Sequence, residues 1–550
     1  MSISSKLLKV GGLTHSLSVY VPSMILQKLI GMGRLVILTR LISRSEYALW
    51  GIGLMIFTLV GPMLTLGANH SLVRYVSLYE ARGELDRFYR RVRWWVLGLS
   101  ALFTLIIFLQ IDNILMLANS LSNFLSAQTA TTAEPASFSV MLSIVGNIFL
   151  MGIFVCMMAL IYGMRLYRLA AVLELFFTIS FSAVALIWSR NQPDASAVLN
   201  SHFITLAATL VAGIFFCEKA VCKLRDPKIQ KEFSHDQQLI VPAEPSEEIP
   251  SDLQSSIEPR ERFKTPAAVP GTVSPAPGAA QVMRFSLFSM ISSLIWSSVG
   301  YIAFTMVYLR WGGDHAGPFN AVQRLCQPVI FIANAAWGVL FAHVAKRWEA
   351  GNKDGALYIL ETTYKAISIS VMTLAVLLSA LSPIWIKILS PDYQFGINYV
   401  PGLLMLYMVL CNMSLLTIFC KLHERPVIIS LAAVIGGSFI CAFAAFWMPM
   451  SGEPFWGEVG AARAAGVGMF FGAGVTMLIY LLACKIKLQE STYFIIAMPV
   501  FLLVPPVYLT GFWTAFIGVT FFTNFMFSSQ QKQTLLNPVR DKIRRLRGRN

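Results

Sequence analysis

Long apolar runs separated by short polar segments dominate the chain. A helix of about 20 apolar residues crosses a bilayer. Fourteen runs come close to that length, at residues 14–39, 47–69, 94–115, 138–164, 169–189, 198–217, 284–308, 317–345, 366–387, 399–420, 427–448, 460–484, 492–509 and 512–528. The pattern predicts an all-α integral membrane protein with about fourteen transmembrane helices.

The last two runs are the least regular of the set. Only a few residues separate them, and Pro505 and Pro506 interrupt the first. Proline removes a backbone donor and breaks a helix. The pair is therefore expected to form either a tight hairpin or one irregular element, and residues 492–528 do not by themselves establish two full spans.

The composition agrees with a membrane protein. The 550 residues are 56% hydrophobic and only 13% charged, with a mean hydropathy of +0.65. The net charge of +15 does not indicate nucleic acid, because the lysines and arginines cluster in short segments between apolar runs. Such clusters mark cytoplasmic loops.

The basic segments also predict the orientation. The stretch from Arg74 to Arg93 holds six arginines, and the tail 531–550 is similarly basic. With an even number of spans, both lie on the side of the N terminus, so both termini are expected in the cytoplasm and the protein in the cytoplasmic (inner) membrane. Arg40 and Arg44 fall on the opposite, outer face and are exceptions to this rule.

The chain start and the cysteines suggest neither processing nor metal chemistry. The stretch MSISSKLLKVGGLTHS lacks a compact apolar core followed by a cleavage site, so the first helix is expected to remain as an anchor. The eight cysteines form no C-x-x-C pair and have no histidine at metal-ligand spacing. They are expected to be small buried apolar side chains, and no metal site is predicted.

One long polar segment, residues 218–282, divides the chain. It is basic, then acidic, and ends in the Pro-, Ala- and Gly-rich stretch TPAAVPGTVSPAPGAA. Such a composition buries too little apolar surface to offset chain ordering, so we expect a disordered cytoplasmic linker, with an acidic docking segment as the alternative.

The two sides of this linker resemble each other faintly. LVRYVSLYEARG (72–83) follows the second run, and AHVAKRWEAGNK (342–353) follows the eighth, which suggests a six-helix repeat. The expected organisation is two six-helix bundles plus a C-terminal helical pair. Its parts are an N-terminal bundle (1–217), the linker (218–282), a C-terminal bundle (283–484), the trailing pair (485–530) and a basic cytoplasmic tail (531–550).

Polar residues inside two of the runs are the main functional signal. On the first, Ser23, Gln27, Gly31 and Arg34 fall within roughly 80 degrees on a helical projection, with Lys28 at the edge of this stripe. A cation at the centre of a membrane helix costs about 2.5 to 3.5 kcal/mol on insertion scales. Something must therefore compensate for these cations.

A second stripe lies on the eighth run, around an expected kink at Pro328. It consists of Asn320, Gln323, Arg324, Gln327 and Asn334. If the two helices face each other across a cleft between repeated halves, their cations and amides suit an anionic group such as a phosphate or pyrophosphate. All these residues, with Lys28, Arg34 and Gln27, are predicted to bind substrate.

The cations also have a purely structural interpretation. Lys28 or Arg34 could snorkel, bond backbone carbonyls or pair with Glu174, the clearest intramembrane acid. Glu174 is thus either a coupling or gating residue or an ion-pair partner. His202 is a second coupling candidate, because histidine titrates near neutral pH, or else a hydrogen-bonded helix contact.

Two further residues stand at the cytoplasmic end of the second run. His70 and Arg74, in GANHSLVRY, could meet a substrate headgroup entering from inside or could anchor the helix at the interface. The chain has no phosphate-binding P-loop, no H-E-x-x-H metal pair and no G-x-S-x-G elbow. We therefore expect a secondary transporter and not an enzyme, with no cofactor.

Two stretches carry a family resemblance. ILTRLISRSEYALWGIG with LTLGANHSLVRYVSLYEARGE, and AGPFNAVQRLCQPVIFIANAAWGVLFAHVAKRWEAGNKD, resemble the first two helices and the eighth helix of bacterial polysaccharide and O-antigen (Wzx-type) flippases. These belong to the multidrug/oligosaccharidyl-lipid/polysaccharide (MOP) exporter superfamily. The resemblance covers most of the membrane portion, but the long linker departs from the family's short connection.

The resemblance implies two six-helix bundles around a central cavity, with trailing helices. It also implies a flippase that moves a polyprenyl-pyrophosphate-linked oligosaccharide across the membrane for cell-surface polysaccharide biosynthesis. The expected partners are this lipid-linked oligosaccharide, membrane lipid, and a polysaccharide polymerase with glycosyltransferases. Sugar, driving ion and oligomeric state stay open.

Three alternatives remain at the level of sequence. The trailing pair is like that of the lipid II flippases of the same superfamily. A multidrug cation antiporter would be expected to carry a carboxylate in an early helix, where this chain has Lys28 and Arg34. A non-transporting scaffold of a glycan-synthesis complex would use the linker and tail to hold partners.

Overall fold

The structure is a computed structural model, and every regular element in the part that it describes is helical. The described residues are 13–69, 84–110, 138–164, 166–224, 279–333, 353–389, 391–423, 427–448, 454–483, 489–529 and 531–533, with isolated positions between 72 and 79 and between 337 and 348.

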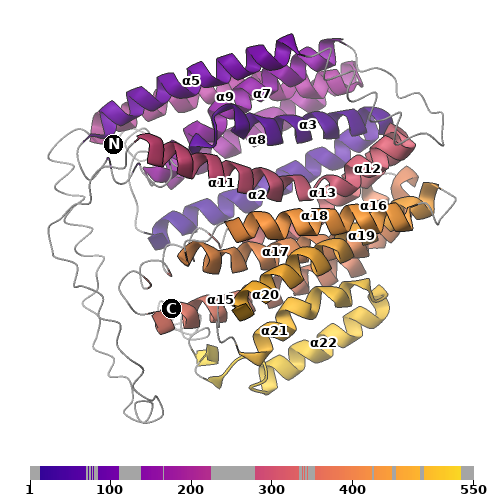
Figure 1. The fold of residues 1–550 in the computed structure, drawn as a ribbon. Helices are drawn as coiled ribbons and strands as arrows, with labels where there is room; N and C mark the ends of the chain where they lie inside the picture. Colours follow the sequence, from indigo (N-terminus) through magenta and orange to yellow (C-terminus); the bar gives the residue numbers. More distant parts are fainter. Residues whose placement is uncertain are drawn as a thin grey trace, which may run out of the picture.

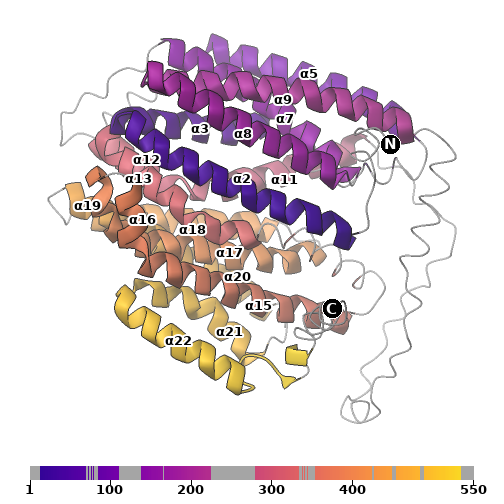
Figure 2. The same ribbon diagram turned by 180° about the vertical axis from the view of Figure 1, so that it is seen from behind.

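The first group of helices, named here the N-terminal bundle, consists of α2 (Leu13–Leu41), α3 (Arg44–Leu64), α5 (Leu85–Leu109), α7 (Phe138–Gly163), α8 (Tyr167–Asn191) and α9 (Ala195–Leu224). Within it, α2 packs on α8, α3 on α7, and α7 on α9. These helices form one side of the molecule, coloured indigo to magenta in Figures 1 and 2.

The second group, the C-terminal bundle, begins with α11 (Ala279–Val299), α12 (Ile302–Trp311), α13 (Gly313–Cys326), α15 (Lys353–Ala380), α16 (Ser382–Leu389) and the 3-10 helix η2 (Pro391–Tyr399). It continues with α17 (Val400–Leu422), α18 (Val427–Trp447), α19 (Pro454–Met469), the π-helix η4 (Phe470–Gly474) and α20 (Val475–Ala483). The helix α19 packs on both α17 and α18.

The fold class predicted from the apolar runs is confirmed. Among the described residues, nine helices are long and apolar enough to cross a membrane, and α11 with α12 makes a tenth span that bends by 52°. The predicted run 284–308 is therefore not straight, because it breaks between Val299 and Ile302. The eighth run also breaks beside Pro328 as predicted, since α13 ends at Cys326.

Burial separates central helices from lipid-facing ones. The span that contains α17 is 94% buried inside the protein, whereas that of α5 is only 11% buried. Both helices are strongly apolar, so hydropathy alone does not distinguish them. The apolar surface of α17 packs on other helices, and that of α5 is left for the lipid.

The trailing pair combines the two predicted possibilities. Its first arm starts as α21 (Glu490–Ala497), tightens into the 3-10 helix η5 (Met498–Leu503) at Pro499, and is followed by α22 (Pro506–Phe522). Asn412 of α17 donates to the carbonyl of Ile495 at 3.3 Å, next to this irregular turn. The pair is a hairpin with an irregular first arm (Figures 1 and 2).

The two bundles meet at both ends of α3. At one end, named here the Arg40 end, α3 packs on α13 and α2 packs on α16. At the other, the Gly67 end, a Cβ on Gly67 would lie 2.5 Å from the carbonyl oxygen of Ser286 on α11. Gly67 also has a φ of 69°, which glycine adopts without strain.

The predicted linker is shorter at both ends than the composition indicated. The helix α9 continues to Leu224 and α11 begins at Ala279, so the first and last residues of segment 218–282 are helical. Arg93 of α5 pairs with Glu218 at 2.6 Å, which ties the extension of α9 to the N-terminal bundle. Residues 225–278 lie outside the described part of the chain.

Candidate substrate site

Lys28 on α2 reaches across to the C-terminal bundle. Its Nζ lies 3.6 Å from the centroid of the Phe331 ring, which follows the break at Pro328. An ammonium over an aromatic face is stabilised by the ring quadrupole. The contact brings the predicted stripe of α2 against the eighth predicted span, as the sequence hypothesis required.

Arg34 lies one to two turns further along α2. Its Nη1 donates to the Ser182 hydroxyl at 3.4 Å, and its guanidinium carbon is 4.1 Å from the centroid of the Phe181 ring. Arg324, on α13 of the other bundle, is close enough to repel Arg34 electrostatically. Arg324 itself donates to Asn320 Oδ1 at 3.1 Å. Two like charges therefore face each other between the bundles.

The expected acidic partner forms no ion pair with the cations, although it attracts Lys28 electrostatically. Glu174 on α8 accepts a short hydrogen bond from the hydroxyl of Tyr162 and a long one, at 3.5 Å, from that of Tyr20. Among the described residues, the ion pairs are Arg90 with Asp86, Arg93 with Glu218, His315 with Glu458, and Lys365 with Glu361. Lys28, Arg34 and Arg324 belong to none of them. We call these three cations the cationic group.

Part of the α2 stripe faces its own bundle. Ser23 donates to the carbonyl of Ala171 on α8 at 3.3 Å, and the amide of Gln27 donates to Ser23 at 3.4 Å. Gln27 is buried. Packing against α8 thus gives Ser23 and Gln27 structural contacts, while Lys28 reaches the other bundle.

The amides on the eighth predicted span divide in the same way. Gln323 donates a short hydrogen bond to the carbonyl of Gly300, which the break between α11 and α12 leaves without a helical partner. Gln327 donates to the hydroxyl of Tyr407 at 3.3 Å. In contrast, Asn320 Nδ2 is buried with no hydrogen-bond partner. Asn320 is therefore the amide that retains an unused donor beside Arg324.

His202 is enclosed by aromatic rings. Its Nδ1 lies 2.7 Å from Asn147 Oδ1, whose amide nitrogen donates to two backbone carbonyls. The rings of Phe57 and Phe181 are centred 4.6 and 5.0 Å from the imidazole. This geometry gives His202 a packing and hydrogen-bonding role, the second of the two possibilities from the sequence.

Three predicted binding residues lie outside the described part of the chain. They are His70, Arg74 and Asn334. Conversely, sequence patterns did not single out Tyr47, Tyr162 or Phe331, which surround the cations or Glu174. Aromatic residues are common in membrane helices, so only the packing of the bundles could identify these three.

The cysteines only partly meet the expectation of burial. Cys156, Cys217, Cys326, Cys411 and Cys420 are buried, but Cys222 and Cys441 are exposed. The expectation was wrong for these two, because a small apolar side chain is equally stable on a helix face that meets lipid. Among the described residues, no group of three or more potential ligands could hold a metal ion.

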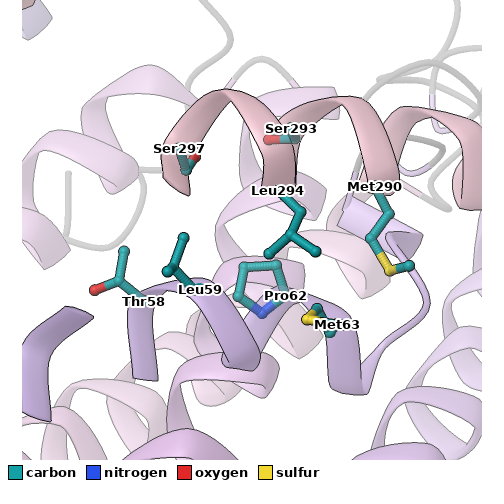
Figure 3. A pocket seen from close by; sticks show the side chains of 8 residues that line it. All are labelled: Thr58, Leu59, Pro62, Met63, Met290, Ser293, Leu294 and Ser297. Carbon is teal, nitrogen blue, oxygen red and sulfur yellow. The ribbon is translucent and has the colours of Figure 1, made fainter. Parts of the chain in front are cut away.

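A small cleft opens between α3 and α11 (Figure 3). It is lined by Thr58, Leu59, Pro62, Met63, Met290, Ser293, Leu294 and Ser297. Its volume of about 30 Å³ suits roughly one water molecule, and no charged side chain lines it. The cleft is thus too small for a headgroup, and the cationic group is the better candidate site.

Comparison with known proteins finds a similarity of fold alone. No protein-family model matches the chain, and no curated protein matches it. Among solved structures, the chain is similar to the lipid II flippase MurJ in an inward closed conformation, with a TM-score of 0.55, 13% identity, and coverage of 94% of this chain and 99% of that chain.

Two other solved structures resemble the chain to about the same extent. A MOP superfamily transporter from Pyrococcus furiosus, described as having a binding pocket of reverse polarity, has a TM-score of 0.54, 12% identity, and coverage of 88% of this chain and 100% of its own. An outward-facing multidrug resistance MATE family transporter has a TM-score of 0.52, 13% identity, and the same coverage. The chain is a multi-pass membrane protein with the fold of the MOP superfamily transporters.

Proposed function

We propose that this protein is a flippase that moves a polyprenyl-pyrophosphate-linked oligosaccharide across the cytoplasmic membrane by alternating access, for cell-surface polysaccharide biosynthesis. One observation carries the proposal. Lys28, Arg34 and Arg324 come from both bundles, lie within the membrane portion, and belong to no ion pair among the described residues.

An anionic substrate would supply the missing counter-charge. A pyrophosphate offers several oxygens to the forked donors of Arg34 and Arg324, and it would relieve their mutual repulsion. Because the two arginines stand on different bundles, a bound headgroup would link both halves. The unused amide donor of Asn320 would add a hydrogen bond. The lipid tail would remain in the bilayer.

The proposed cycle places the Arg40 end on the outer face. The cavity would open toward the cytoplasm, bind the headgroup at the cationic group and reopen outward. Glu174, half-buried on α8 and hydrogen-bonded to the hydroxyls of Tyr20 on α2 and Tyr162 on α7, is the proposed coupling residue. A polymerase and glycosyltransferases are the proposed partners, because the translocated unit must be made on one side and polymerised on the other.

The test replaces the arginines of the site in cells that depend on the protein. Arg34→Ala and Arg324→Ala should each lower export of lipid-linked glycan at least about tenfold, because charged hydrogen bonds to phosphate are strong. Arg190→Ala is the matched control, since Arg190 is an exposed arginine at the end of α8. If both site variants insert normally and export at the wild-type level, the site assignment is wrong.

A lipid II-type substrate is the second candidate, favoured by the trailing pair and by the likeness to MurJ. Supplying purified protein in vesicles with lipid II or with a polyprenyl-pyrophosphate glycan separates the two. A multidrug cation antiporter is disfavoured, because the cationic group would repel cationic drugs. A scaffold would fail after deletion of residues 232–276, whereas a flippase would keep transporting.

A further inference from the structure

Two arginines at the Arg40 end break the expected charge rule. In the proposed orientation, Arg40 and Arg44 lie on the outer face, where positive residues are uncommon. The structure gives both of them contacts with the other bundle. Arg40 ends α2, and Arg44 begins α3.

Arg40 bonds the C-terminal end of a helix across the bundle boundary. Its Nη2 donates to the carbonyl oxygen of Ile388 at 2.5 Å, and its Nε donates to that of Leu389 at 3.1 Å. Both carbonyls belong to the last turn of α16, where backbone oxygens have no partner within the helix. The negative end of the helix dipole also favours a cation there.

The start of α3 is fitted against the start of α13 beside this contact. A Cβ on Gly317 would lie 2.2 Å from the carbonyl oxygen of Arg44, and one on Gly313 would lie 3.0 Å from Ser45 Cβ. Only glycine permits so close an approach. The Arg44 guanidinium also lies 5.8 Å from the centroid of the Phe395 ring on η2. These contacts form the α3/α13 seam.

We propose that Arg40 is a latch that holds the Arg40 end of the two bundles closed. Opening this end requires α2 to leave α16, which breaks both hydrogen bonds to the carbonyls of Ile388 and Leu389. The latch therefore stabilises the closed state of the Arg40 end relative to its open state. This inference rests on the proposed alternating-access cycle, and it assigns a role to a cation that is separate from the cationic group.

A crosslink across the seam measures closure directly. Ser45→Cys with Gly313→Cys places two thiols on facing helices, whose Cβ atoms, 3.0 Å apart, need to separate by only about 0.5 to 1 Å to reach the spacing of a disulfide. In the full-length protein in membranes, oxidation should crosslink this pair rapidly. Adding Arg40→Gln should slow crosslinking about 3- to 10-fold, the loss expected for one partly buried and one exposed hydrogen bond. The crosslinking rate with Arg40→Lys should lie between those of the parental pair and of Arg40→Gln. Lysine keeps the positive charge but lacks the planar guanidinium that donates to both carbonyls.

Two further variants complete the test. Lys387→Gln removes a cation from the last turn of the same α16, and it should leave the rate unchanged, since Lys387 forms no hydrogen bond or ion pair with the described residues of α2. Gly317→Ala should slow the crosslink by pushing Arg44 away. The latch is refuted if the parental pair does not crosslink, or if Arg40→Gln crosslinks at the parental rate.

The crosslinking assay tests the latch and the export assay tests the flippase site, so either proposal can be refuted without the other. If Arg40→Gln slows the crosslink while Arg34→Ala and Arg324→Ala export normally, the latch holds and the flippase site assignment is wrong. If those two variants abolish export and Arg40→Gln leaves the crosslink unchanged, the site stands and the latch does not.

Discussion

Two described regions of this protein hold cations between helices, half-buried in one and fully buried in the other, and they differ in what surrounds the charge. In the first, the cationic group of Lys28, Arg34 and Arg324 forms no ion pair among the described residues, and Glu174 attracts only Lys28 electrostatically. In the second, Lys365 of α15 is fully buried, and its Nζ lies 2.5 Å from Gln489 Oε1. We call this second region the Lys365 cluster.

In the Lys365 cluster, other residues of the chain are the partners of both the ammonium and the nearby carboxylate. The ammonium also donates to Ser491 Oγ at 2.7 Å and lies 3.7 Å from Glu361 Oε1. That carboxylate accepts from the backbone N–H of Gln489 at 2.8 Å and from the hydroxyl of Thr492. The cluster thus joins α15 to the start of α21 and fixes the trailing pair. We interpret a charge whose hydrogen-bond and ion-pair partners all come from the protein as structural. A charge that lacks such partners is available to a ligand.

The largest expected effect is on the Lys365 cluster. Lys365→Met should lower the free energy of unfolding by about 3 to 5 kcal/mol, because it leaves the Glu361 carboxylate buried without its cation. Thermal unfolding in detergent measures the loss. The double variant Glu361→Met with Lys365→Met should recover part of it. A single variant as stable as the wild type would show that the cluster is not what holds the trailing pair.

The matched change in the cationic group should have a much smaller effect on stability. Arg34→Met loses a 3.4 Å hydrogen bond and a ring contact, but it also removes repulsion from Arg324. The unfolding free energy should change by at most about 1 kcal/mol, while glycan export falls. The same thermal assay compares the two methionine variants directly. A loss of stability as large as that of Lys365→Met would remove the distinction between the two regions.

The smallest effect is a pH dependence at the Arg40 end. His315 precedes the predicted span 317–345, and its Nδ1 donates to Glu458 Oε1 at 2.5 Å. This hydrogen bond raises the pKa of His315 above its ordinary 6.5. Asp314 also favours the charged form, and Arg44 opposes it. A raised pKa in the folded state stabilises below the unfolded pKa, and this stabilisation disappears as pH rises through the folded value.

The difference in melting temperature between wild type and His315→Gln should therefore be greatest below pH 6.5 and shrink at higher pH. Because the side chain of His315 is 39% exposed, solvent screening keeps this effect below those of the two methionine variants. A difference that does not change with pH would mean that the ion pair with Glu458 contributes nothing to the stability of the C-terminal bundle.

The apolar runs predicted the fold class and most helices, since any run long enough to span a bilayer must form a helix to satisfy its backbone. They misplaced boundaries where polar residues are buried by packing. Lys365 precedes the predicted run 366–387, yet it lies inside α15, which starts at Lys353. Its partners Gln489 and Ser491 are more than a hundred residues away in the chain.

The candidate site was predicted as a set of residue types and not as a set of contacts. Helical periodicity put Gln27 and Lys28 near one another, but packing placed Gln27 beside Glu174 of α8 and Lys28 over the ring of Phe331. Likewise, Gln323 bonds the carbonyl at the break of α11 and α12, because that break exists only in the folded bundle. Periodicity defines a face on a helix and does not say what the face meets.

Hydropathy and the lengths of the apolar runs are properties of the chain, and they were enough to establish a multi-pass helical membrane protein with cations in its first and eighth predicted spans. Only the tertiary structure decided which cations are satisfied, which acid is engaged, and that Arg40 reaches α16. The physical reason is that a charge in a membrane is governed by its nearest partners, and here these come from helices far apart in sequence.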